Sequence, residues 1–490
     1  MRLSKIVLSN FRCFSSLEVD FHPEMTVLVA ENGQGKSSVL DAVRIALWPF
    51  VSSFDLARNA FSDPGNVITV DDVRIVKGHD KDMIRQLPCE ISATGDFGIG
   101  SEKTWSRYRD SEARRSKTKD AGHTSFMRQW AVAVQNQIRA PDKPVLDLPV
   151  FGYYGTGRLW AQKKLTEASK TADDTKSSDF YIRTFAYMNC LDPASSYKHF
   201  QEWFTLISNI YWEAVMKMFE GKGRETDVLQ AETPLGVVRQ AIDALLRPVT
   251  GWHSLEYSHS HEESLVLHHD EHGVLKVEQL SDGIRSVLAM IGDIAYRCYK
   301  LNPHLGLEAA RQTEGVVMID EVDMHLHPLW QQRVLKQLRD AFPKVQFIVT
   351  THSPQVLTSI DASCVRLLKE EADPETGERR AVAKKIDQQT KGVASSDILL
   401  EIMSVNPTPP VEEAGWLADY IARIENGTHA DEDGVSLRKR LEDHFGARHP
   451  LMLDADRLIR FQAFKTIFEK QISIENIVYG FLKDFPESNL

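Results

Sequence analysis

The chain of 490 residues is poor in cysteine and lacks long apolar runs. Its five cysteines are isolated, without a C-x-x-C pair, which argues against a disulfide framework and against a structural zinc site. No apolar run approaches the roughly 18–20 residues that a membrane-spanning helix needs. The N-terminus alternates like a strand and lacks the apolar core of a signal peptide. We therefore expect a cytoplasmic protein with no membrane partner.

The chain also lacks an excess of positive charge, internal repeats and sustained heptads. Its formal net charge is −11, which argues against a protein coated in nucleic acid but leaves room for a local basic groove. Without heptads there is no long coiled coil. The hydrophobic fraction of 42% and the charged fraction of 26% are those of an ordinary globular protein. The length allows two or three domains, or one core with a large insertion.

The stretch VLVAENGQGKSSVLDAV, Val27–Val43, resembles a phosphate-binding loop. A strand over Met25–Val29 precedes it and an apolar helical pattern follows it, so that backbone N–H groups can wrap phosphates at a helix N-terminus. Gly33 and Gly35 predict positive φ. Lys36 would contact the β- and γ-phosphates. The expected first glycine is Ala30, which is tolerable if its φ is negative.

Further residues of the loop complete the predicted ATP and Mg²⁺ site. The hydroxyl of Ser37 would bind Mg²⁺. Asn32 and Ser38 are the remaining nucleotide-binding candidates of this loop.

Two apolar strands downstream end in polar residues. Gly315–Ile319 reads as a buried strand of a parallel sheet and is followed by Asp320 and Glu321. Carboxylates at such a strand end can support Mg²⁺ and polarise an attacking water. A second strand, Val345–Thr350, leads to His352, which can reach a γ-phosphate. His325 and His327 stand two apart and do not predict a metal pair.

The stretch Leu280-Ser281-Asp282-Gly283 precedes an apolar helical face. Its serine and glycine would lie at a helix N-terminus, which favours an anion, although a capped amphipathic helix explains the same residues.

Taken in order, these motifs resemble the ABC-type ATPases related to RecF, SMC and OLD proteins. DEVDMHLHP and FIVTTHSPQVL are most similar to the RecF/OLD branch. YYGTGRLW (Tyr153–Trp160) and LMLDADRLIRFQAFK are similar to the ATPase of Septu anti-phage systems, which also accompanies some retrons. The resemblance implies an α/β fold, an ABC-type P-loop head with a parallel-sheet core, a β-rich lobe, a helical insertion and a helical C-terminal region.

The resemblance also implies roles. Lys36 and Ser37 would hold phosphate and Mg²⁺, Asp320 would support Mg²⁺, and Glu321 would be the catalytic base. His352 would be the switch histidine, and Asp323 would lie in the D-loop. Ser281 and Gly283 would contact the ATP of a second copy, in a homodimer or higher oligomer.

Some positions depart from the family pattern or stay open. Arg12 in NFRCF matches a residue on the adenine side. The stretch Leu280–Gly283 corresponds to the family's signature motif. In it, Asp282 replaces the usual second glycine and places a carboxylate near a phosphate, which suggests slow or regulated hydrolysis. The family's Q-loop glutamine, which links the sheet to the helical lobe, has one candidate stretch here, Gln135–Gln137; alternatively, the YYGTGR turn occupies its place without a glutamine.

The same pattern divides the chain. We expect an ATPase core from 1–50 and 270–395, a β-rich lobe with polar hairpins over 51–150, and a helical lobe over 151–269. A helical C-terminal region over 396–490 would follow.

The stretch Lys103–Asp120 carries seven Lys/Arg beside a Trp and a Tyr, which suggests a nucleic-acid contact. It also contains three acidic residues, which favour a solvated hairpin tip instead.

Three functions compete. In the first, implied by the Septu resemblance, a nucleotide-dependent dimeric clamp senses infection and regulates a partner HNH nuclease, and nucleic acid binds through the complex. The second is a RecF/SMC-like DNA-repair ATPase, whose SMC form needs a missing coiled coil. The third is an OLD-like nuclease using Asp454 and Asp456, although this stretch reads as helix. An apolar stripe in the tail from Phe464 to Leu482 would pack as core or dock the partner.

Overall fold

The computed structural model describes residues 1–57, 64–78, 82–97, 101–141, 144–159, 182–193, 196–372 and 379–465. The chain forms two compact units, Met1–Ser404 and Val405–Leu490. The boundary between the units falls after α11 (Ser395–Glu401), a helix that begins close to the predicted start of the helical C-terminal region at 396. Most of the predicted tail stripe, from residue 466 onward, lies outside the described residues.

A five-stranded antiparallel sheet forms the β-rich part of the first unit. Its order is β2-β1-β6-β7-β8, and its strands are Arg2–Phe11 (β1), Phe14–Asp20 (β2), Cys89–Asp96 (β6), Glu102–Arg109 (β7) and Lys119–Gly122 (β8). Two short 3₁₀ turns, η2 (Pro64–Asn66) and η3 (Val70–Asp72), and a small hairpin of β4 (Ile75–Lys77) and β5 (Met83–Arg85) precede β6 in the chain. The first strand, β1, therefore pairs with β2 and β6 in this sheet and not with a strand of the parallel sheet.

A six-stranded sheet forms the core of the first unit, in the order β16-β15-β3-β14-β13-β9. All its pairs are parallel except that of β15 with β16. Its strands are Met25–Val29 (β3), Val150–Tyr154 (β9), Gly315–Ile319 (β13), Val345–Thr351 (β14), Val365–Ala372 (β15) and Arg379–Lys385 (β16). Strands β3, β9, β13 and β14 are buried throughout, which confirms the two apolar strands predicted downstream.

Helix α1 (Lys36–Val51) is buried on both of its sides, between the two sheets. Its apolar residues therefore form more than a single stripe. Pro49 lacks the N–H that would bond the Ile45 carbonyl, and Arg107 Nη1 donates to that carbonyl at 2.9 Å. Arg107 and Arg109 are buried and bond backbone carbonyls, so the predicted solvated hairpin keeps two of its cations inside.

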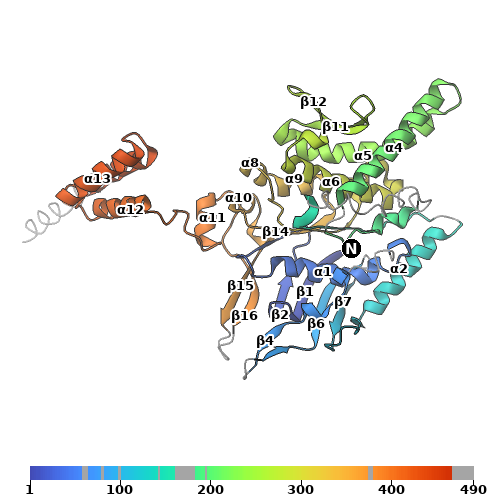
Figure 1. Cartoon of the computed structure of the whole chain (residues 1–490), viewed down its shortest axis with the longest axis horizontal. Helices are drawn as coiled ribbons and strands as arrows, with labels where there is room; N and C mark the ends of the chain where they lie inside the picture. The colour runs from blue at the N-terminus through green and yellow to red at the C-terminus, as the bar shows by residue number, and fades with distance from the viewer. Residues whose placement is uncertain are drawn as a thin grey trace, which may run out of the picture. The chain divides into compact units, whose positions relative to one another are not determined.

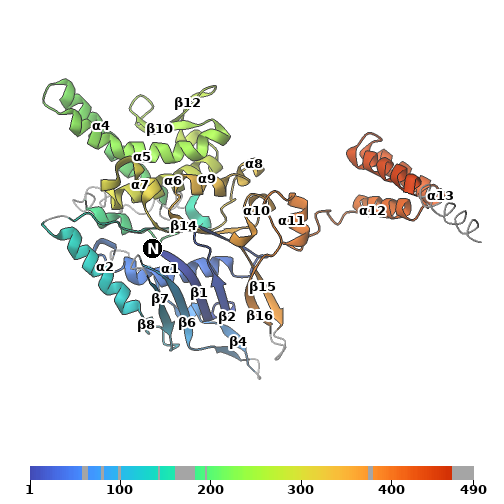
Figure 2. The same cartoon turned by 180° about the vertical axis from the view of Figure 1, so that it is seen from behind.

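Helices cover the other face of the parallel sheet. Figures 1 and 2 show α1 and the antiparallel sheet on one side of β14, and α5, α6 and α9 on the other. The helices of this unit besides α1 and α11 are α2 (Thr124–Arg139), α4 (Ser196–Phe219), α5 (Glu225–Thr250), α6 (Asp282–Leu301), α7 (Ala309–Gln312), α8 (Pro328–Gln331), α9 (Val334–Ala341) and α10 (Pro354–Leu357). The 3₁₀ turns are η4 (Thr156–Leu159), η7 (Arg183–Tyr187), η8 (Val277–Gln279), η9 (Pro303–Glu308) and η10 (Ala362–Cys364).

The predicted helical lobe over 151–269 is not purely helical. It begins with β9, a strand of the parallel sheet, and ends with a small antiparallel sheet of β10 (His253–Ser258), β11 (Ser264–His269) and β12 (Gly273–Lys276). Between them, α4 and α5 form a hairpin whose outer half exposes Trp212, Met216 and Phe219 on α4. These three residues are spaced for one face of a helix.

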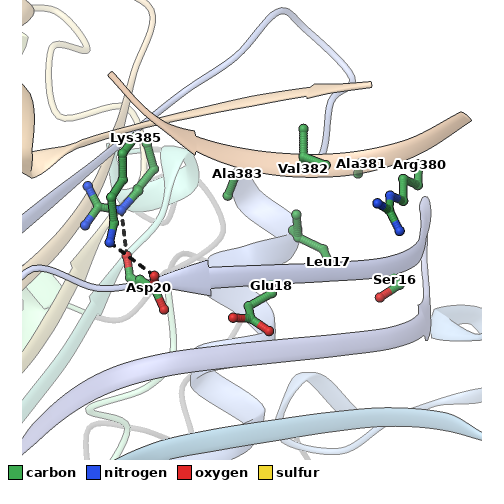
Figure 3. A pocket seen from close by; sticks show the side chains of 10 residues that line it. Ser16, Leu17, Glu18, Asp20, Arg380, Ala381, Val382, Ala383 and Lys385 are labelled. Carbon is green, nitrogen blue, oxygen red and sulfur yellow. Dashed lines mark hydrogen bonds and ion pairs between the residues drawn. The ribbon is translucent and has the colours of Figure 1, made fainter. Parts of the chain in front are cut away.

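The two sheets approach each other at their edge strands, β2 and β16 (Figure 3). A shallow hollow of about 290 Å³ lies between them. Lys385 Nζ lies 3.3 Å from the Asp20 carboxylate, and Arg366 Nε donates to the Asp20 carbonyl at 2.7 Å. These contacts tie the antiparallel sheet to the core just before β3, the strand that leads to the phosphate loop.

The second unit has its own small core. Helices α12 (Glu412–Glu425) and α13 (Glu432–Phe445) pack with a helical segment over residues 450–465 around Tyr420, Ile424, Leu441 and Met452. Asp454 and Asp456 lie on that helical segment, as the helical interpretation predicted. Asp454 pairs with Arg457 at 2.7 Å and Asp456 with Arg438 at 2.7 Å. Two carboxylates two apart on a helix point in different directions, which disfavours a shared metal site.

Within the described part of the chain, no helix is both long enough and apolar enough to cross a membrane.

A buried polar network joins β9 to α6. Tyr154 donates its hydroxyl to Asp293 Oδ2 at 2.8 Å, and Arg297 Nε donates to the same oxygen at 2.8 Å. Arg297 also donates to the carbonyl of Met188 at 3.1 Å. Burial raises the pKa of the Tyr154 phenol, which keeps it a neutral donor. The network fixes the signature helix against the strand that ends beside Asp320.

Replacing Arg297 by Met should lower the free energy of unfolding by about 3–5 kcal/mol, because Asp293 would stay buried without its cation. Chemical denaturation followed by circular dichroism measures this loss. The control is Lys336→Met, which removes an exposed pair with Asp340 and should cost about 1 kcal/mol or less. Equal losses in the two variants would contradict the assignment.

Candidate nucleotide site

The predicted phosphate loop has the backbone that a phosphate cradle needs. Gly33 and Gly35 both have φ of 82°, which confirms their predicted left-handed conformation. Ala30 is not among the residues with positive φ, so alanine fits this position without strain. Gly35 is also crowded, since an added Cβ would overlap the Phe14 ring and lie 2.7 Å from the Cys13 sulfur. The turn between β1 and β2 therefore packs directly on the loop.

The side chain of Lys36 closes the loop on itself. Its Nζ donates to the carbonyl of Ala30 at 2.9 Å and to that of Glu31 at 3.1 Å. Burial lowers the pKa of Lys36, an effect opposed by the nearby carboxylates of Asp320 and Glu321. An ammonium has three protons, so these two bonds leave one for a phosphate oxygen. Asn32, Ser37 and Ser38 line the same turn at the start of α1, with Asn32 and Ser37 exposed.

Asp320 lies at the centre of the site. It follows β13, and its Oδ2 accepts a hydrogen bond from Ser37 Oγ at 2.8 Å, while its Oδ1 accepts one from Thr350 Oγ1 at 2.6 Å. The structure thus brings together the two residues predicted to support Mg²⁺. They come from segments 283 positions apart in the sequence.

The oxygens of Ser37 and Asp320 fit Mg²⁺, which prefers hard oxygen ligands and keeps several positions for water and phosphate. No group of three or more His, Cys, Asp or Glu suited to a metal occurs in the described ranges. A Mg²⁺ site of one carboxylate and one hydroxyl, completed by water and nucleotide oxygens, needs no such larger cluster of protein ligands. When bound, the ion would neutralise charge on the phosphates.

Glu321 has an unusual backbone. Its φ is 47°, a left-handed conformation that costs a non-glycine residue about 1–3 kcal/mol. Its N–H donates to Thr350 Oγ1 at 2.7 Å, and the next N–H, of Val322, donates to the Thr350 carbonyl at 3.0 Å. Strain of this kind is concentrated at functional sites. Thr350 therefore holds the turn that carries the predicted catalytic base.

The predicted D-loop residue, Asp323, lies in the turn after β13, and the predicted switch residue, His352, lies at the end of the neighbouring strand β14. Asp323 Oδ1 accepts a hydrogen bond from Thr351 Oγ1 at 2.5 Å, and His352 follows β14 directly. His327 instead caps α8, where its ring accepts the N–H of Leu329 at 3.3 Å.

The signature residues lie at the start of α6. Ser281 is its N-cap and is exposed, whereas Gly283 is buried against the carbonyl of His325, where a Cβ would not fit. Asp282 pairs with Arg285, which donates a hydrogen bond and thereby lowers the pKa of the Asp282 carboxyl. Arg285 therefore offsets the charge of the residue that departs from the family pattern.

Arg12 is held by two carboxylates. Its Nε donates to Asp72 at 2.8 Å and its Nη1 to Asp41 at 2.5 Å, and Tyr153 donates to the same Asp41 at 3.0 Å. This chain of contacts joins the β1–β2 turn, α1 and β9. Through Asp41, the guanidinium of Arg12 is fixed one helical turn beyond the phosphate loop.

The two candidate places for the Q-loop differ in position. Gln135 is buried on α2, where its side chain contacts Asp55. The turn after β9 instead begins beside the acidic residues, since Asp320 N–H donates to the Tyr154 carbonyl at 2.8 Å. Gly155 and Thr156 therefore occupy the strand end next to Asp320, and the glutamines do not.

Sequence reasoning missed Thr350, Thr351, Tyr153 and Asp41. The first two lie in the quoted TTHSP stretch, so their position at a strand end was visible. Their partners were not, because the hydrogen bonds depend on the order of β13 and β14 in the sheet.

Two family models match the chain. One, described as "AAA domain", matches residues 5–212, and the other, described as "AAA domain, putative AbiEii toxin, Type IV TA system", matches residues 227–358. The first match contains the phosphate loop, and the second contains the signature, β13 and β14.

The chain is also similar to individual proteins. It is 27% identical to the "Retron Ec83 probable ATPase" of Escherichia coli, over 96% of this chain and 89% of the relative. It is 42% identical to a "Septu protein PtuA" of Bacillus mycoides (strain KBAB4), over 20% of this chain and 13% of the relative. Among solved structures, an SMC head bound to the C-winged helix domain of ScpA matches with 14% identity and a TM-score of 0.46, over 79% of this chain and 99% of that one.

Replacing Gly35 by Ala should weaken ATP binding more than replacing Gly33 by Ala. Both variants place a Cβ at positive φ, at about 1–2 kcal/mol, but only at Gly35 must Phe14 and Cys13 also move. We expect a loss of roughly tenfold for Gly33→Ala and at least another tenfold for Gly35→Ala. Titration with a fluorescent ATP analogue measures both, and equal losses would show that the packing of the β1–β2 turn is irrelevant.

Proposed function

We propose that this chain hydrolyses ATP with Mg²⁺ as a nucleotide-dependent dimer and acts in anti-phage defence. It is an ABC-type AAA ATPase related to the retron and Septu ATPases. The observation that carries the ATPase chemistry is the contact between Ser37 and Asp320, beside the strained Glu321.

Each residue has a physical task in this proposal. Lys36 and the loop N–H groups would bind the phosphates, and Ser37 and Asp320 would hold Mg²⁺. Glu321 would polarise the attacking water, and His352 would contact the γ-phosphate. Binding alone does not require a base, so Glu321 favours an enzyme over a nucleotide-binding scaffold.

The dimer follows from the position of the signature. Ser281 is exposed at the N-terminus of a long helix, where N–H groups and the helix dipole favour an anion. In the proposed dimer, Ser281 and Gly283 of one copy complete the ATP site of the other. Since ATP adds its phosphate contacts only to the closed dimer, nucleotide binding favours closure.

The Glu321→Gln variant should bind ATP normally but lose about 10²–10⁴-fold in turnover, because the amide cannot accept the proton. Light scattering of this variant with ATP and Mg²⁺ should give a dimer. Normal turnover would refute the role of Glu321, and a monomer would refute the closed dimer.

Mixing two inactive variants tests the shared site further. Lys36→Ala inactivates the phosphate loop, and Ser281→Arg inactivates the signature. In a mixed dimer, one site combines the intact phosphate loop of the Ser281→Arg chain with the intact signature of the Lys36→Ala chain. Equal amounts should recover about a quarter of wild-type activity if chains exchange freely. No recovery would favour a site built within one chain.

The partner is the less direct part of the proposal. The Septu resemblance implies an HNH endonuclease, which would read the open or closed state of the dimer. The second unit offers a docking face, since Leu453, Phe461 and Phe464 lie on one side of the helical segment 450–465 and are exposed. Exposed aromatic and aliphatic residues of this kind often mark protein interfaces.

We expect the purified chain alone not to cut DNA, and the double variant Leu453→Glu/Phe461→Glu to lose co-purification with its nuclease while keeping ATPase activity. Trp212→Glu/Phe219→Glu on α4 is the matched control, because it removes an equally exposed apolar surface. If only the Trp212→Glu/Phe219→Glu variant loses co-purification with the nuclease, the docking site would lie on α4 instead. Mg²⁺-dependent cutting by the single chain, lost in Asp454→Ala, would favour the OLD-like alternative.

A further inference from the structure

Thr350 contacts both acidic residues of the candidate site through one hydroxyl. It lies near the end of β14, between β3, which leads to the phosphate loop, and β13, which leads to Asp320. Its side chain is completely buried, at 0% exposure, so water does not compete for its hydrogen bonds.

The two bonds use different parts of the hydroxyl. Thr350 Oγ1 donates its only proton to Asp320 Oδ1 at 2.6 Å and accepts the N–H of Glu321 at 2.7 Å. A hydroxyl has one proton and two lone pairs, so both bonds form together. The donor to Asp320 is therefore fixed in direction.

This arrangement orients the carboxylate. With Oδ1 bound to Thr350, Oδ2 faces Ser37 Oγ at 2.8 Å, on the side of the phosphate loop. A carboxylate free to rotate would lose this direction part of the time. The second bond, from the Glu321 N–H to Thr350 Oγ1, holds the backbone of Glu321 at its φ of 47°. Because the backbone is fixed, the direction in which the Glu321 side chain leaves the turn is fixed as well.

We propose that Thr350 is a positioning residue for ATP hydrolysis, which sets the orientation of Asp320 toward Mg²⁺ and the placement of Glu321. The inference rests on the proposed ATPase function. In this proposal Thr350 acts through its hydrogen bonds to Asp320 and Glu321 and not by binding nucleotide or metal itself. Groups that orient a metal-binding residue typically affect metal affinity or activity by 10–100-fold.

Three variants of the full chain test the proposal. Thr350→Val keeps the shape and removes the hydroxyl, whereas Thr350→Ser keeps the hydroxyl and removes the methyl group. Thr26→Val is the matched control, because Thr26 is equally buried in β3 but bonds the N–H of His22, away from the acids. For each, we would measure kcat, KM for ATP, and the Mg²⁺ concentration that half-saturates binding of a fluorescent ATP analogue.

Thr350→Val should lower kcat by about 10–100-fold and raise the half-saturating Mg²⁺ concentration by a similar factor. KM for ATP at saturating Mg²⁺ should change little, since the phosphate loop is untouched. Thr350→Ser and Thr26→Val should both stay close to wild type. If Thr350→Val does not fold by circular dichroism, Thr350→Ala serves in its place.

The inference is overturned if Thr350→Val matches Thr26→Val in both kcat and Mg²⁺ dependence. It is also overturned if Thr350→Ser is impaired as strongly as Thr350→Val, because packing of the methyl group would then be the cause. Absence of turnover in the wild-type chain would instead refute the proposed function. In that case the Mg²⁺ titration of nucleotide binding still tests Thr350 separately.

Discussion

The carboxylate of Asp320 is the interaction on which the rest of the site depends. It accepts hydrogen bonds from the phosphate loop through Ser37 and from β14 through Thr350, and its backbone N–H bonds β9. Three neighbouring strands and the first turn of α1 therefore meet at one residue. Their parallel order is what makes this convergence available, because the carboxyl ends of parallel strands share one edge of a sheet.

The surrounding fold fixes that edge in place. Helix α1 is buried between two sheets, so the phosphate loop cannot tilt without disturbing both. On the opposite face, the Tyr154–Asp293–Arg297 network ties the end of β9 to α6. The loop itself is closed by Lys36, which bonds two loop carbonyls and keeps a proton for a phosphate. These bonds within the chain restrict the conformations of the loop, which reduces the cost of ordering it when a phosphate binds.

The sequence predicted those parts of the site that are local. The loop glycines, the helix after them and the strands before Asp320 and His352 were visible as spacing and apolar runs, and the structure has them. Contacts between distant segments were not predictable in this way. The pairing of β1 with β6, the membership of β9 in the parallel sheet and the burial of Arg107 depend on long-range partners. From the sequence, Arg107 was interpreted as part of a basic run. Its neighbours in the sequence do not reveal that Pro49 leaves the Ile45 carbonyl without a helical N–H partner, to which Arg107 donates.

Neighbouring residues accommodate the two positions, Ala30 and Asp282, that depart from the family pattern. Ala30 needs no positive φ, and its carbonyl accepts from Lys36. The carboxylate of Asp282 is bound by Arg285, so an anion approaching Ser281 meets a pair rather than an isolated negative charge.

Two adjacent threonines connect the remaining parts. Thr350 bonds Asp320 and Glu321, and Thr351 bonds Asp323, whose loop continues to the His325 carbonyl that packs on Gly283. His352 follows these threonines on the same strand end. A displacement of His352 by a phosphate would therefore act on the threonines that hold the acidic turn and the loop beneath the signature. This strand end therefore connects His352 to Gly283, at the proposed dimer surface, through contacts within one chain.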